Sequence, residues 1–174
     1  MAREVVGMDN IIRNLNKEIK KIEGRTEAGM LQAALFIKGE SQKEIPVVTG
    51  HARASAFVVS SSGINVEAGA DEDTIEAAAE AKAVVSAKTK AGNPSSAVGF
   101  GAVYAAALHE NPRAGQTGGV SPSGVPYRAP INPSGERSSQ GVYSTVGKWK
   151  FLEDPIKTNV RRILQIIARK AKIR

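Results

Sequence analysis

The chain contains no cysteine and only two histidines in its 174 residues. The lack of cysteine excludes disulfides and thiolate metal sites, and it fits folding in a reducing compartment such as the cytosol. His51 and His109 occur in no His-x-x-x-His or Glu-x-x-His spacing, so no helix face offers a pair of metal ligands. We therefore expect no metal. We expect His109 or Glu110 to hydrogen-bond the chain near Arg53, or a neighbouring subunit.

Long apolar runs and catalytic motifs are also missing. No run approaches the ~20 apolar residues of a membrane span, and the N-terminus lacks a signal-peptide core, so neither a membrane association nor export is expected. There is no Walker motif, no dinucleotide-binding glycine motif, no nucleophile elbow and no pair of acids at catalytic spacing. These absences predict a protein that is not an enzyme and needs no cofactor.

Positive charge is what the chain has in excess. The net charge is +7, and most of the excess lies in residues 148–174, where only Glu153 and Asp154 are acidic. Such a segment can be the solvated face of a helix, bind an acidic protein, or bind a nucleic acid. Zinc-finger spacing, basic-zipper heptads and a clear helix-turn-helix are all lacking, which disfavours specific DNA reading. Trp149 lies between two lysines and could stack on a base, but a place in the core or at a subunit interface is favoured.

Helical patterns occupy both ends of the sequence. Apolar residues recur at helical spacing over residues 8–23 and 26–45, and Gly24 is expected to break or bend the helix between them. Pro46 should end the second helix, because it disfavours helix in the residue before it. Residues 154–170 predict a C-terminal helix whose apolar stripe forms a second wall of the core.

Strand patterns fill the middle of the chain. Residues 54–60 and 64–69 flank a short glycine-containing turn and predict an antiparallel hairpin, and further strands are expected at 96–100 and 141–147. Together with the helices this predicts a single α+β domain over residues 1–174. Its antiparallel sheet of about four strands should be packed by the N-terminal helices and the C-terminal helix.

Two stretches do not fit that compact arrangement. Residues 70–94 are alanine-rich after an acidic start, and they predict either a projecting helix or a long excursion between strands. Their acidic start could meet the basic C-terminal helix of a neighbour. Residues 112–141 are too rich in proline and glycine for a packed element and predict a long projecting loop. Within that loop, Tyr127 and Arg128 could anchor a partner.

Three short motifs resemble the neck, or tail-completion, proteins of tailed bacteriophages. The first is a helix ending in Pro-Val-x-Thr-Gly-x-x-Arg-x-Ser before a strand. The second is a strand followed by a tyrosine–alanine to glutamate helix, and the third is a phenylalanine–leucine element that introduces the last helix. The motif positions in this sequence are Pro46, Thr49, Gly50, Arg53, Tyr104, His109, Glu110, Phe151 and Leu152.

The resemblance implies a structural virion protein assembled in the host cytoplasm. Proteins of this kind form rings, commonly hexamers, that complete or terminate the tail tube and dock it to the head connector, while genomic DNA passes through the lumen without being read. The implied partners are further copies of the chain, the tail tube protein and the connector or stopper proteins. Candidate interface residues are Trp149, Tyr127, Arg128, Arg161 and Arg162. The alternative is a basic nucleic-acid-binding module that uses the C-terminal helix.

Overall fold

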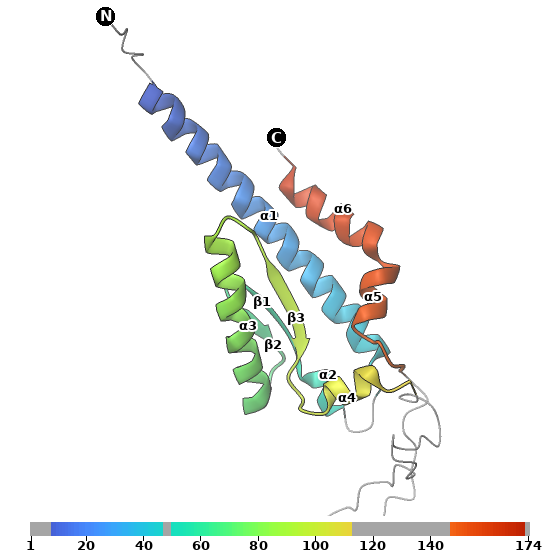
Figure 1. Ribbon diagram of the computed structural model, residues 1–174. Coiled ribbons are helices and arrows are strands. Elements are labelled where there is room, and N and C mark those ends of the chain that lie inside the picture. Colours follow the sequence, from blue (N-terminus) through green and yellow to red (C-terminus); the bar gives the residue numbers. More distant parts are fainter. Residues whose placement is uncertain (1–7, 47–49, 113–146, 173–174) are drawn as a thin grey trace, which may run out of the picture.

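A computed structural model describes residues 8–46, 50–112 and 147–172 (Figure 1). The described part is an α+β structure, which confirms the predicted fold class. Its elements in chain order are α1 (Met8–Glu44), α2 (His51–Ala54), β1 (Ala56–Ser60), β2 (Ile64–Val66), α3 (Glu72–Lys90), β3 (Ser96–Phe100), α4 (Ala105–Glu110), α5 (Glu153–Thr158) and α6 (Val160–Ala171).

The sheet has three antiparallel strands in the order β2-β1-β3 within the described residues. The predicted hairpin is confirmed as β1 and β2, and the predicted strand at 96–100 is confirmed as β3. All five residues of β1 are buried, because α3 covers one face of the sheet and α1 the other (Figure 1). The predicted strand at 141–147 lies outside the described residues except for Gly147, and so does nearly all of the predicted loop at 112–141.

The N-terminal region is one helix of 37 residues, so the prediction of two helices separated at Gly24 is wrong. A glycine inside a helix costs only about 1 kcal/mol relative to alanine, which is too little to interrupt a long amphipathic pattern. The helix ends at Glu44, as the proline at position 46 predicted. At 1.5 Å per residue it is about 55 Å long. Its N-terminal half therefore extends well beyond the sheet (Figure 1).

Residues 70–94 do not project from the molecule, so the prediction of a projecting helix is wrong. Helix α3 lies across the sheet and buries Thr74, Ala78 and Val85. The strands on either side of α3 are not adjacent, because β1 lies between β2 and β3. Helix α3 is thus the connection that carries the chain from one edge of the sheet to the other. Small residues suffice on its inner face, because it packs close to the strands.

The C-terminal helix is divided in two, where one helix over 154–170 was predicted. Helix α5 ends at Thr158 and α6 begins at Val160. Helix α6 lies along α1, and the two backbones come so close that a Cβ added at Gly29 would lie 3.0 Å from the Ile167 carbonyl oxygen. No residue of α6 is fully buried, and Leu164 is 60% exposed. The apolar stripe of the C-terminal helix, which was predicted to form a second wall of the core, is therefore only partly buried.

Candidate functional site

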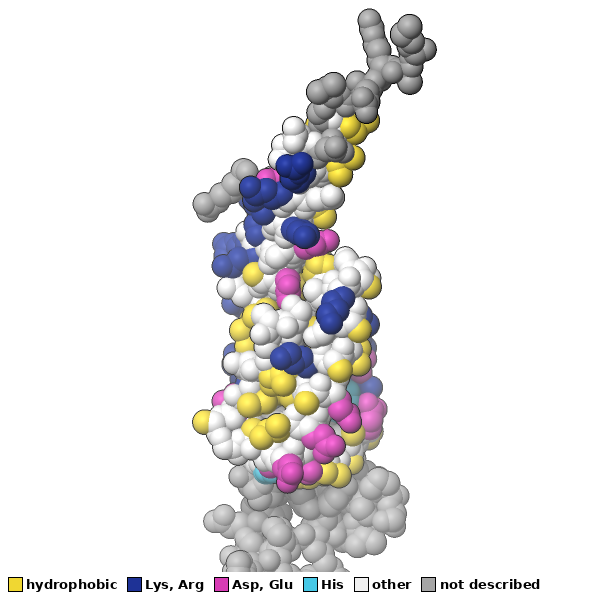
Figure 2. Space-filling model, turned by 90° about the vertical axis from the view of Figure 1, so that its left-hand side faces the viewer, with side chains coloured by type: hydrophobic (Ala, Val, Ile, Leu, Met, Phe, Trp, Pro, Cys, Tyr) yellow, Lys and Arg dark blue, Asp and Glu magenta, His cyan; other side chains and the backbone are white. Residues whose placement is uncertain are grey.

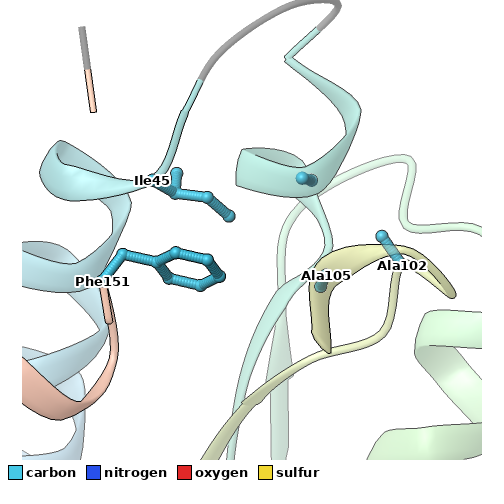
Figure 3. Packing of buried hydrophobic residues seen from close by; sticks show 5 residues of the cluster. Ile45, Ala102, Ala105 and Phe151 are labelled. Carbon is cyan, nitrogen blue, oxygen red and sulfur yellow. The ribbon is translucent and has the colours of Figure 1, made fainter. Parts of the chain in front are cut away.

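The motif segments of the sequence meet at the lower end of the molecule, which we define as the region where the end of α1, α2, α4 and residues 147–152 come together (Figure 1). A buried apolar cluster holds them. Figure 3 shows Ile45 and Phe151 side by side, pointing toward Ala102 and Ala105. The cluster consists of Ile45, Ala52, Ala102, Ala105 and Phe151.

Phe151 is the centre of this cluster. It is 1% exposed, and its ring meets the Phe100 ring edge-on at a centroid distance of 5.2 Å and the His109 ring at 5.1 Å. Leu152 is partly buried beside it. The phenylalanine–leucine element thus joins the C-terminal helices to the end of the sheet, by burial of a large apolar side chain.

The corner after α1 is stabilised by backbone geometry. Pro46 is buried, and Gly50 has a φ of 83°, a left-handed value that favours glycine. Gly147 packs on Pro46 so closely that an added Cβ would lie 2.5 Å from the proline Cα. Helix α2 follows Gly50, so the strand begins at Ala56 and not at 54 as predicted. The motif residue Thr49 lies outside the described residues.

Among the described residues, His109 and Glu110 make no hydrogen bond with Arg53, so a bond to a neighbouring subunit stays a prediction. The backbone carbonyl of Arg53 accepts a hydrogen bond of 3.0 Å from Gln42 Nε2. The Nε atom of Arg53 is buried and has no hydrogen-bond partner among the residues that the structure describes. Gln42 therefore supports the corner that contains Arg53. It was not predicted, because a glutamine within a helix belongs to no recognisable motif.

The motif residue Tyr104 is 43% exposed. Its ring lies 5.9 Å from the His51 ring, and His51 Nε2 lies 3.0 Å from Asp71 Oδ2 at the start of α3. The Asp71 side chain also accepts a hydrogen bond of 2.9 Å from the Thr74 N–H, and the side chain and the backbone N–H of Thr74 together lower the pKa of the carboxyl. The Tyr104 ring, the His51 ring and the Asp71 carboxylate therefore connect α4, α2 and α3 at the surface.

His109 and Glu110 belong to an ion network with the segment before α5. His109 Nδ1 lies 2.8 Å from Glu110 Oε1, Lys150 Nζ lies 3.5 Å from Glu110 Oε2, and Lys150 Nζ lies 2.7 Å from Glu153 Oε2. The bond from His109 lowers the pKa of Glu110, and the Lys150 and Lys157 ammonium groups lower the pKa of Glu153 to about 2. The bond to Glu153 raises the pKa of Lys150.

A second pair of contacts fixes the same segment to α1. The Lys148 backbone N–H donates to the Glu44 carbonyl at 2.8 Å, and Lys148 Nζ lies 3.0 Å from Asp154 Oδ2 and 3.3 Å from Glu44 Oε2. The bond to Asp154 raises the pKa of Lys148. These groups are charged and exposed to water, so their arrangement connects chain segments and offers no activated nucleophile.

Beside the cluster lies a mostly apolar pocket of about 250 Å³. It has the size and lining to accept an apolar side chain from a partner. Its walls come from the end of β3, from α4 and from the phenylalanine–leucine element, and they are Phe100, Ala105, Ala106, His109, Glu110, Phe151 and Leu152.

The basic residues are not gathered at one place. Arg25 of α1 lines a groove of about 560 Å³ together with Arg169, Lys170 and Lys172. Of the predicted interface arginines, Arg162 lies over the Phe36 ring at 4.6 Å, and Arg161 is exposed on α6. Arg25 could not be linked to this groove from the sequence, because it is far from the C-terminus in the chain. Figure 2 shows Lys and Arg over the upper part of the face it presents, with Asp and Glu at the lower end.

Trp149 is 39% exposed, which disagrees with the predicted place in the core and leaves the subunit interface and stacking on a base as predictions. Lys150 Nζ lies 5.6 Å from the centre of its ring. Tyr127 and Arg128 lie outside the described residues. Among the residues that the structure describes, no three His, Asp or Glu side chains are grouped as metal ligands would be. No helix in the described ranges is long and apolar enough to cross a membrane.

Comparison of the chain with protein-family models, with curated proteins and with solved structures found no match. The arguments for a function therefore come from the geometry above and from the short motifs. That geometry is a packed lower end, a basic groove and several exposed apolar helix faces.

Proposed function

We propose that this chain is a structural, non-enzymatic protein of the bacteriophage neck. In this role it forms a ring at the head–tail junction, completes or terminates the tail tube, and docks the tube to the head connector. The observation that carries the proposal is the meeting of the three motif segments, which are far apart in the sequence, around Phe151 at one end of the sheet. Motifs that converge on one structural unit are a stronger signal than three separate short matches.

The exposed surface is consistent with an assembly part. Large apolar side chains are uncovered on several helices, among them Ile11 at 63%, Leu15 at 59% and Leu164 at 60%. Contiguous apolar surface on a soluble chain marks a place where a partner binds. A ring multiplies weak contacts between subunits, so each contact can be small.

The test is to mix the purified protein with tail tubes of the phage and to image them by negative stain. The proposal predicts rings that cap one end of each tube and a mass in solution that is a multiple of the subunit mass. A protein that stays monomeric and leaves both tube ends uncapped would contradict it. Loss of a turnover activity on substitution of both His51 and His109 would contradict the non-enzymatic role.

A second candidate function is binding of a nucleic-acid backbone in the groove of Arg25, Arg169, Lys170 and Lys172. Each phosphate contact contributes about 0.9 to the slope of log K against log salt for duplex DNA. Replacing Arg169 and Lys172 with glutamine should lower that slope by about 2 for duplex DNA. The matched control replaces Lys88 and Lys90 of α3, and it should leave the slope unchanged. This candidate would be excluded if the affinity for duplex DNA changed neither with salt concentration nor in the variant of Arg169 and Lys172.

A further inference from the structure

Helix α3 presents a side to solvent that nothing in the described chain covers. Its inner side chains Thr74, Ala78 and Val85 are buried against the sheet, so the opposite side of the helix points outward. Ile75 and Val84 lie at the two edges of this outward side and are 53% and 57% exposed. Figure 2 views the molecule from the α3 side and shows hydrophobic side chains there, with Asp and Glu below them.

Acidic side chains mark the lower half of this outward side. Glu72, Glu76 and Glu80 follow one another at intervals of four, so they form one row along the helix. All three are exposed, and none forms an ion pair with another described residue. Small side chains form a second row beside them, which lets another helix come close. These are Ala79, Ala83 and Ala87.

Helix α6 presents a complementary side at the other edge of the molecule. It packs toward α1 through Ile163 and Ile167. Its opposite side carries Arg161, Gln165 and Arg169, again at intervals of four, and all three are exposed. Neither arginine has an ion-pair partner in the part of the chain that the structure describes, and α6 contains no acidic residue.

The two charged rows have the same length. Glu72 and Glu80 are eight residues apart, and so are Arg161 and Arg169, which corresponds to about 12 Å along each helix. Leu164 is 60% exposed beside the arginines, so a contact on this side also buries apolar surface. Opposite charges at matched spacing favour the association of two surfaces and fix its register.

One chain cannot bring these two helix sides together. Helix α3 covers one face of the sheet, α1 covers the other, and α6 packs on α1 (Figure 1). The outward sides of α3 and α6 therefore lie at opposite edges of the molecule. Each can be covered only by another molecule, and a second copy of this chain carries the complement of both.

We infer that the outward side of α3 in one copy packs on the outward side of α6 in the next copy. The two sides differ, so the contact is heterologous, and its closure into a ring rests on the proposed function. Both helices run in the same general direction within one copy (Figure 1). Rotation about an axis along them therefore brings them together in parallel, with Glu72 opposite Arg161 and Glu80 opposite Arg169.

Cysteine cross-linking tests this register, because the chain has no cysteine of its own. The register places Ala79 of one copy opposite Ala168 of the next, and both positions are exposed. The variant Ala79→Cys with Ala168→Cys should form a ladder of covalent multimers on a denaturing gel after mild oxidation. The control is Val103→Cys with Ala168→Cys, since Val103 is 83% exposed outside both helix sides. A ladder no stronger than in the control would overturn the inference.

Charge exchange tests the same contact by light scattering over a concentration series. Glu80→Arg alone and Arg169→Glu alone should each raise the concentration needed for association about tenfold or more, because each places like charges opposite one another. Combining these two substitutions should restore association. The matched control combines Glu80→Arg with Arg161→Glu, which has the same net charge and should not restore it. Circular dichroism checks that every variant is folded.

Association unchanged in both single variants, or equal association of the two double variants, would overturn the inference. Arginine variants that lose affinity for duplex DNA but associate normally would assign this side of α6 to nucleic acid and overturn the contact between copies. A wild-type protein that is monomeric at every concentration would also overturn it.

The contact and the neck function fail in different ways. Rings that cap tail tubes but are unaffected by these substitutions would retain the neck function and overturn the contact of α3 with α6. Copies that cross-link through α3 and α6 but do not bind tube ends would retain the contact and contradict the neck function.

Discussion

The two ends of the molecule differ in what covers them. At the lower end, the end of α1, α2 and α4 surround Phe151, which is 1% exposed, and ion pairs of Lys148 with Glu44 and of Lys150 with Glu110 connect the segments at the rim. At the upper end, one helix protrudes alone with Leu15 59% exposed. The chain thus completes its packing at one end and leaves apolar surface uncovered at the other.

This contrast separates residues that serve the fold from residues available to partners. The motif residues Phe151 and Leu152 are occupied in holding the C-terminal helices to the sheet. The upper half of α1 contributes nothing comparable to the core, yet it keeps large apolar side chains at helical spacing. Because burial is the main stabilising term, retaining them at an uncovered face fits a contact between molecules.

The largest effect that would sharpen this contrast is expected for Phe151→Ala. Removing a buried aromatic side chain leaves a cavity where the end of α1, α2 and α4 meet, and it should lower the free energy of unfolding by about 3–5 kcal/mol. Chemical denaturation monitored by circular dichroism measures the change.

The matched substitution at the other end is Leu15→Ala. It removes an exposed side chain and should change the free energy of unfolding by less than about 0.5 kcal/mol when the protein is monomeric. Equal losses of unfolding free energy in Leu15→Ala and Phe151→Ala would show that the upper half of α1 is packed in solution. The two ends of the molecule would then not differ in their packing.

Substitutions at two glycines of α1 are expected to change the free energy of unfolding by smaller amounts, and in opposite directions at the two positions. A Cβ added at Gly29 would lie 3.0 Å from the Ile167 carbonyl oxygen of α6, whereas one added at Gly24 would meet nothing within 4 Å. Gly29→Leu should separate α6 from α1 and destabilise the protein by about 1–3 kcal/mol. Gly24→Leu should stabilise it by about 0.5–1 kcal/mol, since leucine is a better helix former than glycine.

Thermal unfolding of both glycine variants gives the comparison directly. Substitution at Gly24 as harmful as at Gly29 would mean that a neighbour covers the upper half of α1. The difference between the two variants is more reliable than either value, because the substitution is the same.

Local patterns of the sequence predicted much of this fold. The end of α1 followed from Pro46, and β3 was predicted at its observed limits from a short β-prone run. These features depend on neighbours along the chain, so residue type and spacing are enough to reveal them. The hairpin of β1 and β2 is of the same kind.

Features that depend on distant contacts were not predictable. Gly24 was expected to break or bend the helix, yet α1 continues through it without a break over 37 residues. Residues 70–94 were expected to form a projecting helix or a long excursion between strands, because their side chains are small. Helix α3 instead packs close to the strands and buries Ala78 completely. The contact of Tyr104 with His51 at the surface depends on how α2 and α4 meet in the fold, which no local pattern reveals.

The smallest expected effect concerns the ion network of the lower end, where Glu153 has a pKa of about 2 against an ordinary value of 4.5. A carboxyl whose pKa is lowered by folding stabilises the protein above pH 4.5, and this stabilisation is lost as the pH falls toward 2. Glu153→Gln should therefore lower the melting temperature slightly at pH 7 and converge with the wild type near pH 2. Glu76→Gln on α3 is the control, and its curve should run parallel to that of the wild type. The Glu153 curve running parallel as well would mean that the network does not hold residues 147–152 in place, so that burial of Phe151 alone secures the lower end.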